Sequence, residues 1–219
     1  MKKYAVIVAG GKGERFGSDV PKQFLLLNGK PVLQHTLNAF SGLADAIIVV
    51  LPAAQIPPWE TLVKQYNINL PHTIVAGGNS RFQSVYNALQ AINEDGIVAV
   101  HDGVRPLTTK ALIENCFSQA LLKGNAVASI ALKDSIRELT EGSSKHVNRN
   151  NYRLTQTPQV FDIATLKNAY RAPEQSYFTD DASVAEAMGE SINLIEGEDS
   201  NIKITVAADL KLAETLLGK

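Results

Sequence analysis

The sequence has one cysteine, little net charge and no long apolar run, and each shortage excludes a class of protein. Cys116 alone can form neither an internal disulfide nor a thiolate metal cluster, and its helical apolar surroundings predict burial. The formal net charge is −1, so no basic field favours a nucleic acid or an anionic membrane. Only six apolar residues separate Lys3 from Gly10, too few for a signal peptide, and no stretch would span a bilayer. We therefore expect a cytoplasmic location.

The chain of 219 residues can bury one substantial core, and we expect one domain over residues 1–219. Short runs that are apolar on both faces alternate with amphipathic patterns. This alternation is typical of a doubly wound α/β fold, a mostly parallel sheet covered on both sides. The expected strands are Tyr4–Val8, Ala46–Leu51, Thr73–Val75, Ile97–His101, Ala126–Leu132, Ile192–Ile195 and Lys203–Val206. The expected helices are Pro31–Phe40, Trp59–Tyr66, Arg81–Ile92, Thr109–Leu122, Asp180–Met188 and Asp209–Leu217.

A glycine-rich loop, Gly10-Gly11-Lys12-Gly13-Glu14-Arg15, follows the first expected strand. Glycines let backbone N–H groups approach a ligand closely, and Arg15 and Lys22 add the fixed positive charge that suits a polyphosphate. A tight turn with solvated cations is the simpler alternative. The combination of three glycines, two cations and a preceding strand favours nucleotide binding.

Two familiar nucleotide loops do not fit. The chain has no Walker A run of Gly-x-x-x-x-Gly-Lys-Ser/Thr. A dinucleotide fingerprint would need glycine at Phe16 and an acidic residue after the second strand, where Pro52 stands instead. NAD and FAD are therefore not expected ligands.

Two further polar loops follow expected strands, Gly77–Ser84 and His101–Pro106. Ligands of parallel sheets bind at the carboxyl ends of strands, so we expect these loops to converge with the glycine loop. Asp102 suits a ribose hydroxyl or a Mg²⁺ shell, or caps its own turn. Ser80 and Gln83 form a candidate capping box, which is the structural alternative to a ligand-binding role.

Residues Lys133 to Asn151 are polar and lack a helical stripe. Two strand-like halves flank Glu141-Gly142-Ser143-Ser144, which predicts a β-hairpin arm, with a flexible surface loop as the alternative. A lone hairpin has too little core to be stable in water, so we expect this arm to lie against something.

In order along the chain, these motifs resemble the 2-C-methyl-D-erythritol 4-phosphate cytidylyltransferases, which are nucleotidyltransferases of non-mevalonate isoprenoid synthesis. The resemblance runs from Val8 to Thr205. It rests on Gly10–Arg15 with Pro21–Phe24, His101–Pro106, Asn148–Asn150 with Thr155–Phe161, Thr179–Ser183, and Asn201–Thr205. Gly103 and Val104 depart from the usual Ala-Ala, and Asp181 replaces a glutamate. The resemblance implies a Rossmann-like fold and a homodimer in which the arm embraces the partner subunit.

The resemblance also implies transfer of CMP from CTP to a polyol phosphate, with Mg²⁺ as cofactor. Arg15 and Lys22 are the implied catalytic residues, which stabilise the transition state at the α-phosphate. Asp102 is the candidate metal ligand, with most of the Mg²⁺ shell supplied by CTP phosphates. The implied nucleotide-binding residues are Ala9, Gly10, Gly11, Gly13, Gly78, Ser84, Asp102 and Gly103. The implied substrate-binding residues are Arg105, Ser135, Arg149, Thr179 and Lys203.

Two alternatives remain. A ribitol-5-phosphate cytidylyltransferase shares the glycine loop and Pro-Lys-Gln, although the segment Thr179–Ser183 favours the erythritol enzyme. A catalytically silent nucleotide-binding module is the other. Both Arg15 and Lys22 are retained, and a protein that only binds nucleotide has no need of cations placed at the α-phosphorus.

Overall fold

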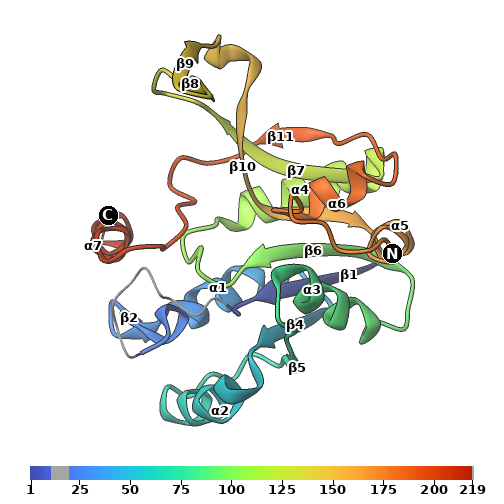
Figure 1. Cartoon of the computed structure of the whole chain (residues 1–219). Coiled ribbons are helices and arrows are strands. Elements are labelled where there is room, and N and C mark those ends of the chain that lie inside the picture. The colour runs from blue at the N-terminus through green and yellow to red at the C-terminus, as the bar shows by residue number, and fades with distance from the viewer. Residues whose placement is uncertain (11–19, 219) are drawn as a thin grey trace.

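The computed structural model describes residues 1–10 and 20–218, and within them a seven-stranded sheet organises the chain (Figure 1). The strand order is β11-β7-β10-β6-β1-β4-β5. Pairing is parallel except at β10, which runs antiparallel to both β6 and β7. The strands of this sheet are β1 (Lys2–Val8), β4 (Ala46–Leu51), β5 (Thr73–Ala76), β6 (Gly96–Asp102), β7 (Asn125–Ala131), β10 (Arg153–Asp162) and β11 (Leu194–Glu196).

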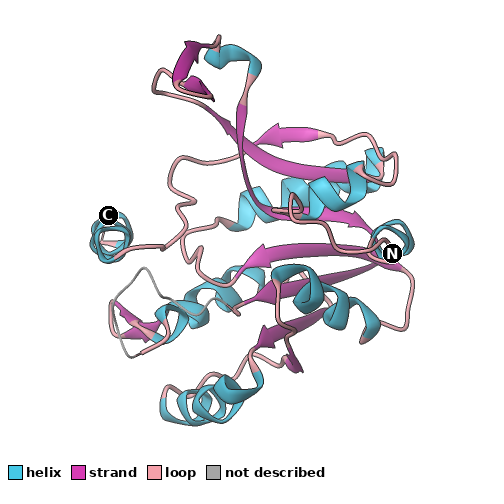
Figure 2. Cartoon of the chain, viewed as in Figure 1, coloured by secondary structure: helices cyan, strands magenta, loops and turns pink. Residues whose placement is uncertain are grey.

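Helices cover both faces of the sheet, as expected for a doubly wound fold (Figure 2). The face carrying Ala5 and Ile7 packs against α1 (Val32–Phe40), α2 (Ile56–Gln65) and α4 (Lys110–Lys123). The face carrying Tyr4 and Val6 packs against α3 (Arg81–Gln90), α5 (Ile163–Ala169) and α6 (Asp181–Glu186). Successive side chains of β1 thus enter opposite cores, which is why its sequence is a continuous apolar run.

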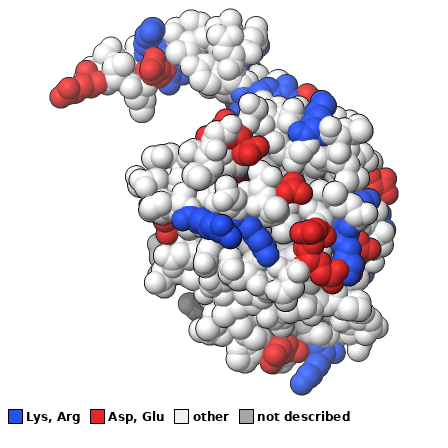
Figure 3. Space-filling view, turned by 90° about the vertical axis from the view of Figure 1, so that its right-hand side faces the viewer, with Lys and Arg blue, Asp and Glu red and all other residues white. Residues whose placement is uncertain are grey.

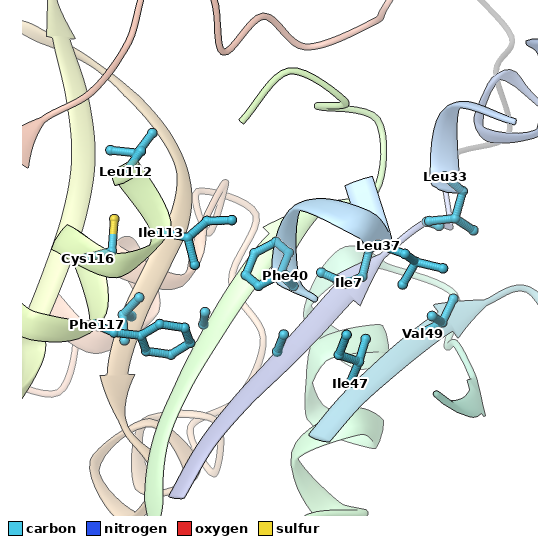
Figure 4. Close-up of a cluster of buried hydrophobic side chains, with 14 of the residues drawn as sticks. Ile7, Leu33, Leu37, Phe40, Ile47, Val49, Leu112, Ile113, Cys116 and Phe117 are labelled. Atoms are coloured by element: carbon cyan, nitrogen blue, oxygen red, sulfur yellow. The ribbon is translucent and has the colours of Figure 1, made fainter. Parts of the chain in front are cut away.

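Cys116 belongs to the first of these cores, beside Ile113 and Phe117 (Figure 4). Burial raises the pKa of its thiol to about 12, so the thiol stays protonated at neutral pH. The prediction of a buried cysteine is confirmed.

A third, smaller cluster joins the C-terminal helix to the loops that leave the sheet. Leu27, Val104, Ile204 and Ala213 pack together in it. Helix α7 (Ala207–Leu217) thereby lies against the small pair β2 (Leu26–Leu27) and β3 (Lys30–Pro31). Three short 3-10 helices complete the described part of the chain, η1 (Lys22–Phe24), η2 (Ala53–Gln55) and η3 (Arg149–Asn151).

The predicted hairpin is present as β8 (Arg137–Thr140) and β9 (Ser143–His146), which form a separate two-stranded sheet. Arg137 pairs with His146 and Thr140 pairs with Ser143, so the tip is the two-residue turn at Glu141 and Gly142. Gly142 has a φ of 70°, a conformation that glycine adopts without steric cost. Figure 3 shows this arm standing away from the rounded body, with charges of both signs on it.

Two expectations about strands were wrong. Residues Lys203–Val206 were expected to form a strand, but among the described residues they pair with no strand. The strand β10 was not expected, because Pro158 and two glutamines lie within it. Its pairing with β7 shifts register between Thr155 and Gln159, which accommodates the proline. Helix α5, which follows β10 directly, was also missed.

None of the described helices is both long and apolar enough to cross a bilayer.

Candidate active site

The polar loops converge at the carboxyl edge of the sheet, as predicted. The end of β1 contacts its neighbours on both sides, because Ala9 N–H donates to Val50 O at 2.9 Å and Gly103 N–H donates to Val8 O at 2.8 Å. Beyond β4, Gly77 N–H donates to Leu51 O at 2.8 Å. Consecutive parallel strands therefore end side by side, and the loops that follow them share one edge.

The residues predicted to read the base lie together on this edge. A Cβ placed on Gly10 would stand 3.9 Å from the Ser84 hydroxyl oxygen. Gly78 N–H donates to the same oxygen at 3.1 Å, and the hydroxyl donates to Ser80 O at 2.8 Å. A Cβ on Gly78 would meet the Gln83 Cβ at 2.3 Å, so this turn admits no side chain. The local hydrogen bonds therefore hold Ser84 in a fixed orientation beside Gly10.

The N-terminus of α3 is capped as expected. Gln83 N–H donates to the Ser80 hydroxyl at 3.0 Å. The Gln83 side chain accepts from Asn79 N–H at 3.0 Å rather than from the Ser80 amide, so the reciprocal half of the box is shifted by one residue. Capping and ligand binding are compatible here because they use different atoms of the same turn.

Gly103 lies so close to the end of β1 that a side chain there would force its neighbours to shift. A Cβ there would lie 2.9 Å from the Cβ of Ala9, well inside normal contact. Its carbonyl accepts from the Thr36 hydroxyl at 3.1 Å. The backbone of this loop is thus held close to the end of β1, where the nucleotide is expected.

Of the predicted phosphate-binding residues, Gly11, Gly13 and Arg15 lie outside the described residues. Lys22 begins η1, next to the buried Gln23. The positive charge of Lys22 also acts on Asp209, in the first turn of α7. Burial by itself would raise the pKa of Asp209, but hydrogen bonds from Thr205 and Val206 and the charge of Lys22 lower it.

Asp102, at the end of β6, is the centre of a cluster of charges. Its Oδ2 atom accepts from Lys203 Nζ at 3.0 Å and from Arg105 Nε at 3.1 Å. Burial by itself would raise the pKa of Asp102, but the nearby cations, Lys203 foremost, hold it well below its usual range. Asp102 therefore stays ionised at every physiological pH.

A cavity of about 200 Å³ opens beside this cluster. Three cationic side chains and two carboxylates line it together with hydroxyls and amides. The lining residues are Arg81, Asp102, Arg105, Thr155, Gln156, Thr157, Gln159, Thr179, Asp180 and Lys203. The cavity unites three of the predicted substrate-binding residues, Arg105, Thr179 and Lys203, and its cationic, hydroxyl-bearing wall suits a phosphate.

The other two predicted substrate-binding residues lie on the arm. Ser135 and Arg149 line a second hollow of about 200 Å³, together with His146, Val147, Asn148 and Asn150. The guanidinium of Arg149 donates to the Lys133 carbonyl across the base of the arm. The chain therefore carries its predicted polyol-phosphate residues in two separate places.

Arg81 is a cavity residue that sequence reasoning did not single out. Its guanidinium forms a two-pronged pair with the buried Asp181, at 3.1 and 2.5 Å, across 100 residues of chain. The Tyr170 hydroxyl also donates to Asp181, at 2.7 Å. Arg81 opens α3 and Asp181 opens α6, so the pair ties together the two helices whose first turns face the site. Spacing in the sequence gives no signal for such a distant partner.

This ion pair predicts a large effect on stability. Arg81→Met leaves the Asp181 carboxylate buried without its counter-ion, and we expect the free energy of unfolding to fall by ~3–5 kcal/mol. Urea denaturation followed by circular dichroism measures this. The double variant Arg81→Met/Asp181→Leu removes both charges and should recover most of the loss. A double variant as unstable as Arg81→Met would contradict this account.

Helix α6 is capped by Asp180, whose carboxylate accepts from Ser183 N–H at 2.9 Å. The Ser183 hydroxyl accepts from Asp180 N–H at 3.3 Å and completes the box. Thr179 is thereby released from the helix end and lines the cavity.

His101 is a packed strand-end histidine. Its ring meets Phe40 edge to face, with centroids 5.2 Å apart. Burial lowers the pKa of His101 to about 3, so the ring is neutral at physiological pH. The ring therefore serves to pack the end of β6 against α1.

A magnesium ion can be held here only with help from a ligand. Among the described residues no group of three or more His, Cys, Asp and Glu side chains could hold a metal. Asp102 fits a shared site, since it lies at the end of β6 and both of its ion pairs use Oδ2 rather than Oδ1. Mg²⁺ commonly binds through one or two carboxylates plus substrate phosphates, so the donor set is compatible with the ion.

A doubly wound sheet with small residues and cations at its carboxyl edge defines the nucleotidyltransferase class, and comparison with known proteins narrows it. Residues 4–219 match the model of the IspD family, 2-C-methyl-D-erythritol 4-phosphate cytidylyltransferase. A protein of that name from Bacteroides fragilis is 48% identical over 219 residues, which cover 99% of this chain and 100% of the relative. The chain belongs to the 2-C-methyl-D-erythritol 4-phosphate cytidylyltransferase family.

Solved structures agree. The 2-C-methyl-D-erythritol 4-phosphate cytidylyltransferase from Thermus thermophilus superposes with a TM-score of 0.82 at 32% identity, covering all of both chains. The 4-diphosphocytidyl-2C-methyl-D-erythritol synthase from Anaerococcus prevotii superposes with a TM-score of 0.86 at 26% identity, covering 100% of this chain and 96% of that one. The predicted fold class and family are both confirmed.

Proposed function

We propose that this chain transfers the cytidylyl group of CTP to 2-C-methyl-D-erythritol 4-phosphate. An oxygen of the polyol phosphate forms a bond to the α-phosphorus of CTP, and the bond between that phosphorus and the bridging oxygen of the β-phosphate breaks. The products are 4-diphosphocytidyl-2-C-methyl-D-erythritol and pyrophosphate. Membership of the family along residues 4–219 is the observation that carries this proposal.

The chemistry needs no acid–base pair, because a phosphate monoester is already an anionic nucleophile near neutral pH. The transition state instead concentrates negative charge around the α-phosphorus, so catalysis rests on positioning and on fixed positive charge. Arg15 and Lys22 supply that charge in our proposal. Arg105, Thr179 and Lys203 hold the polyol phosphate in the cavity that they share.

The pyrimidine lies against Ala9, Gly10, Gly78 and Ser84 in this proposal, and Asp102 and Gly103 hold the ribose. The support is geometric, since Gly10 and Ser84 are adjacent and the turn at Gly78 admits no side chain. Residues this small let the backbone approach the face of a pyrimidine ring closely. Rejection of uracil depends instead on hydrogen-bond polarity along one edge of the base.

Mg²⁺ would be held by the CTP phosphates and by one carboxylate oxygen of Asp102. When bound, the ion neutralises charge on the triphosphate and helps pyrophosphate to leave. Asp102 suits this task because its low pKa keeps it anionic. Its pairs with Lys203 and Arg105 also orient two of the cavity's cations.

A homodimer completes the site in our proposal. Ser135 and Arg149 lie on the arm, apart from the cavity that holds the other substrate-binding residues. An arm that reaches a second copy of the chain would bring them to the partner's cavity. The exposure of Leu139 on the arm, at 84%, supports a partner surface there.

The substrate assignment predicts a clear selectivity. Pyrophosphate release should be fastest with CTP and 2-C-methyl-D-erythritol 4-phosphate, because the proposed base site places the backbone of Gly10 and Gly78 against a single pyrimidine ring. Turnover with ATP or GTP at a rate similar to the rate with CTP would contradict the cytidine assignment. Faster turnover of ribitol 5-phosphate than of 2-C-methyl-D-erythritol 4-phosphate would show that the chain acts as a ribitol-5-phosphate cytidylyltransferase.

A further inference from the structure

Gln23 is completely buried, although it lies in a short turn at the edge of the site. It follows Lys22 in η1 and its exposed fraction is 0%. The side-chain nitrogen donates to Ala9 O at 2.7 Å and to the side-chain oxygen of Gln55 at 2.5 Å. Both partners accept, so both amide hydrogens are used, and neither a carboxylate nor a thioether in this place would supply them.

These two hydrogen bonds join three parts of the chain. Ala9 follows the end of β1, and its own N–H donates to Val50 O of β4 at 2.9 Å. Gln55 ends η2, the short helix that follows β4. Gln23 therefore fixes the turn that carries Lys22 to the carboxyl ends of two neighbouring strands, where the nucleotide is proposed to bind.

A second contact holds the turn without determining its fine placement. The Phe24 ring stacks on Trp59 of α2, with centroids 5.9 Å apart and planes 12° apart. Apolar stacking anchors the turn in the core, but it is not directional. The bond from Gln23 to Ala9 is directional, and it fixes the distance between the Lys22 backbone and the end of β1.

We propose that Gln23 is a positioning residue that places Lys22 against the α-phosphate of the nucleotide. The inference rests on the proposed catalytic role of Lys22. Electrostatic stabilisation depends on charge that is already in place, and a displacement of about 1 Å can cost ~10²-fold in rate. Gln23 would contribute through Lys22 alone, without touching the substrate.

The experiment is a double-mutant cycle between Gln23 and Lys22. Gln23→Met keeps the volume and removes both donors, and we expect it to lower kcat by ~10–10²-fold with an unchanged dissociation constant for CTP. In a Lys22→Ala background the same substitution should change kcat by less than about twofold, because the group that it positions is gone. A residue that only stabilised the fold would lower kcat by the same factor in both backgrounds.

Gln34→Met is the matched control, since Gln34 is a buried glutamine on α1. It should leave kcat unchanged in both backgrounds. If Gln23→Met does not fold, Gln55→Met replaces it in the cycle. Gln55→Met removes one of the two acceptors and keeps the hydrogen bond from Gln23 to Ala9, so we expect a smaller loss of kcat. In the Lys22→Ala background Gln55→Met should again leave kcat unchanged.

Two outcomes overturn the inference in different ways. Equal losses of kcat in both backgrounds would show that Gln23 acts independently of Lys22, and Lys22 would keep its proposed role. An unchanged kcat in Lys22→Ala itself would refute the catalytic role of Lys22, and the positioning role of Gln23 would fall with it.

Discussion

Lys22→Ala is expected to lower kcat by ~10²–10³-fold, the usual cost of losing one fixed electrostatic donor to a transition state. In our proposal Lys22 contacts charge that grows as the polyol phosphate attacks, so its loss should appear in kcat and not only in KM. Steady-state release of pyrophosphate at saturating CTP and polyol phosphate measures this. Arg15→Ala should behave alike, since Arg15 is the other cation proposed to act at the α-phosphate.

Lys30→Ala provides the matched control, because Lys30 is an exposed lysine on β3 outside the proposed site. It should retain wild-type kcat and KM. A Lys22→Ala variant with wild-type kcat and a raised KM would mean that Lys22 binds phosphate equally in the ground state and the transition state.

Mixed dimers should recover activity that two inactive variants lack. In the proposed dimer each site takes Lys22 from one chain and Arg149 from the other. A heterodimer of Arg149→Ala and Lys22→Ala chains therefore has one complete site and one site lacking both residues. Random subunit exchange of equal amounts makes half of the dimers mixed, so about a quarter of wild-type activity should return. Co-expression with two affinity tags isolates the heterodimer for assay.

A second mixture shows whether such recovery is specific. Lys203→Ala and Lys22→Ala both alter the body of the chain, where Lys203 pairs with Asp102. Their heterodimer has no complete site and should stay inactive. The shared-site proposal fails if verified Arg149→Ala/Lys22→Ala heterodimers are inactive, or if the protein is monomeric at assay concentration. Arg149 would then act within its own chain.

The arm illustrates what a sequence pattern conveys and what it omits. Its two halves and glycine turn were predictable, because strand propensity and turn chemistry are local properties. The structure places Ser135 and Arg149 in a hollow of their own, separate from the cavity lined by Arg105, Thr179 and Lys203. That separation was not predictable from the residues, and it is the reason that the proposed function needs a second subunit.

By itself the sequence determined the elements whose signal is local. The apolar runs of β1, β4 and β6, the helices α1, α3 and α4, and the glycine turns were all recognisable from period and composition. The same local patterns placed the polar loops at strand ends, and hence at one edge. Only tertiary structure decided which distant side chains meet there.

The pairs Arg81 with Asp181, Asp102 with Lys203, and Gln23 with Ala9 join segments that the chain order keeps apart. The insertion of β10 between β6 and β7 belongs to the same class, since its buried glutamines are satisfied by partners far along the chain. Periodicity records which face of an element is buried. It carries no information about which distant polar group a buried polar side chain will contact. Tertiary packing decides those partners.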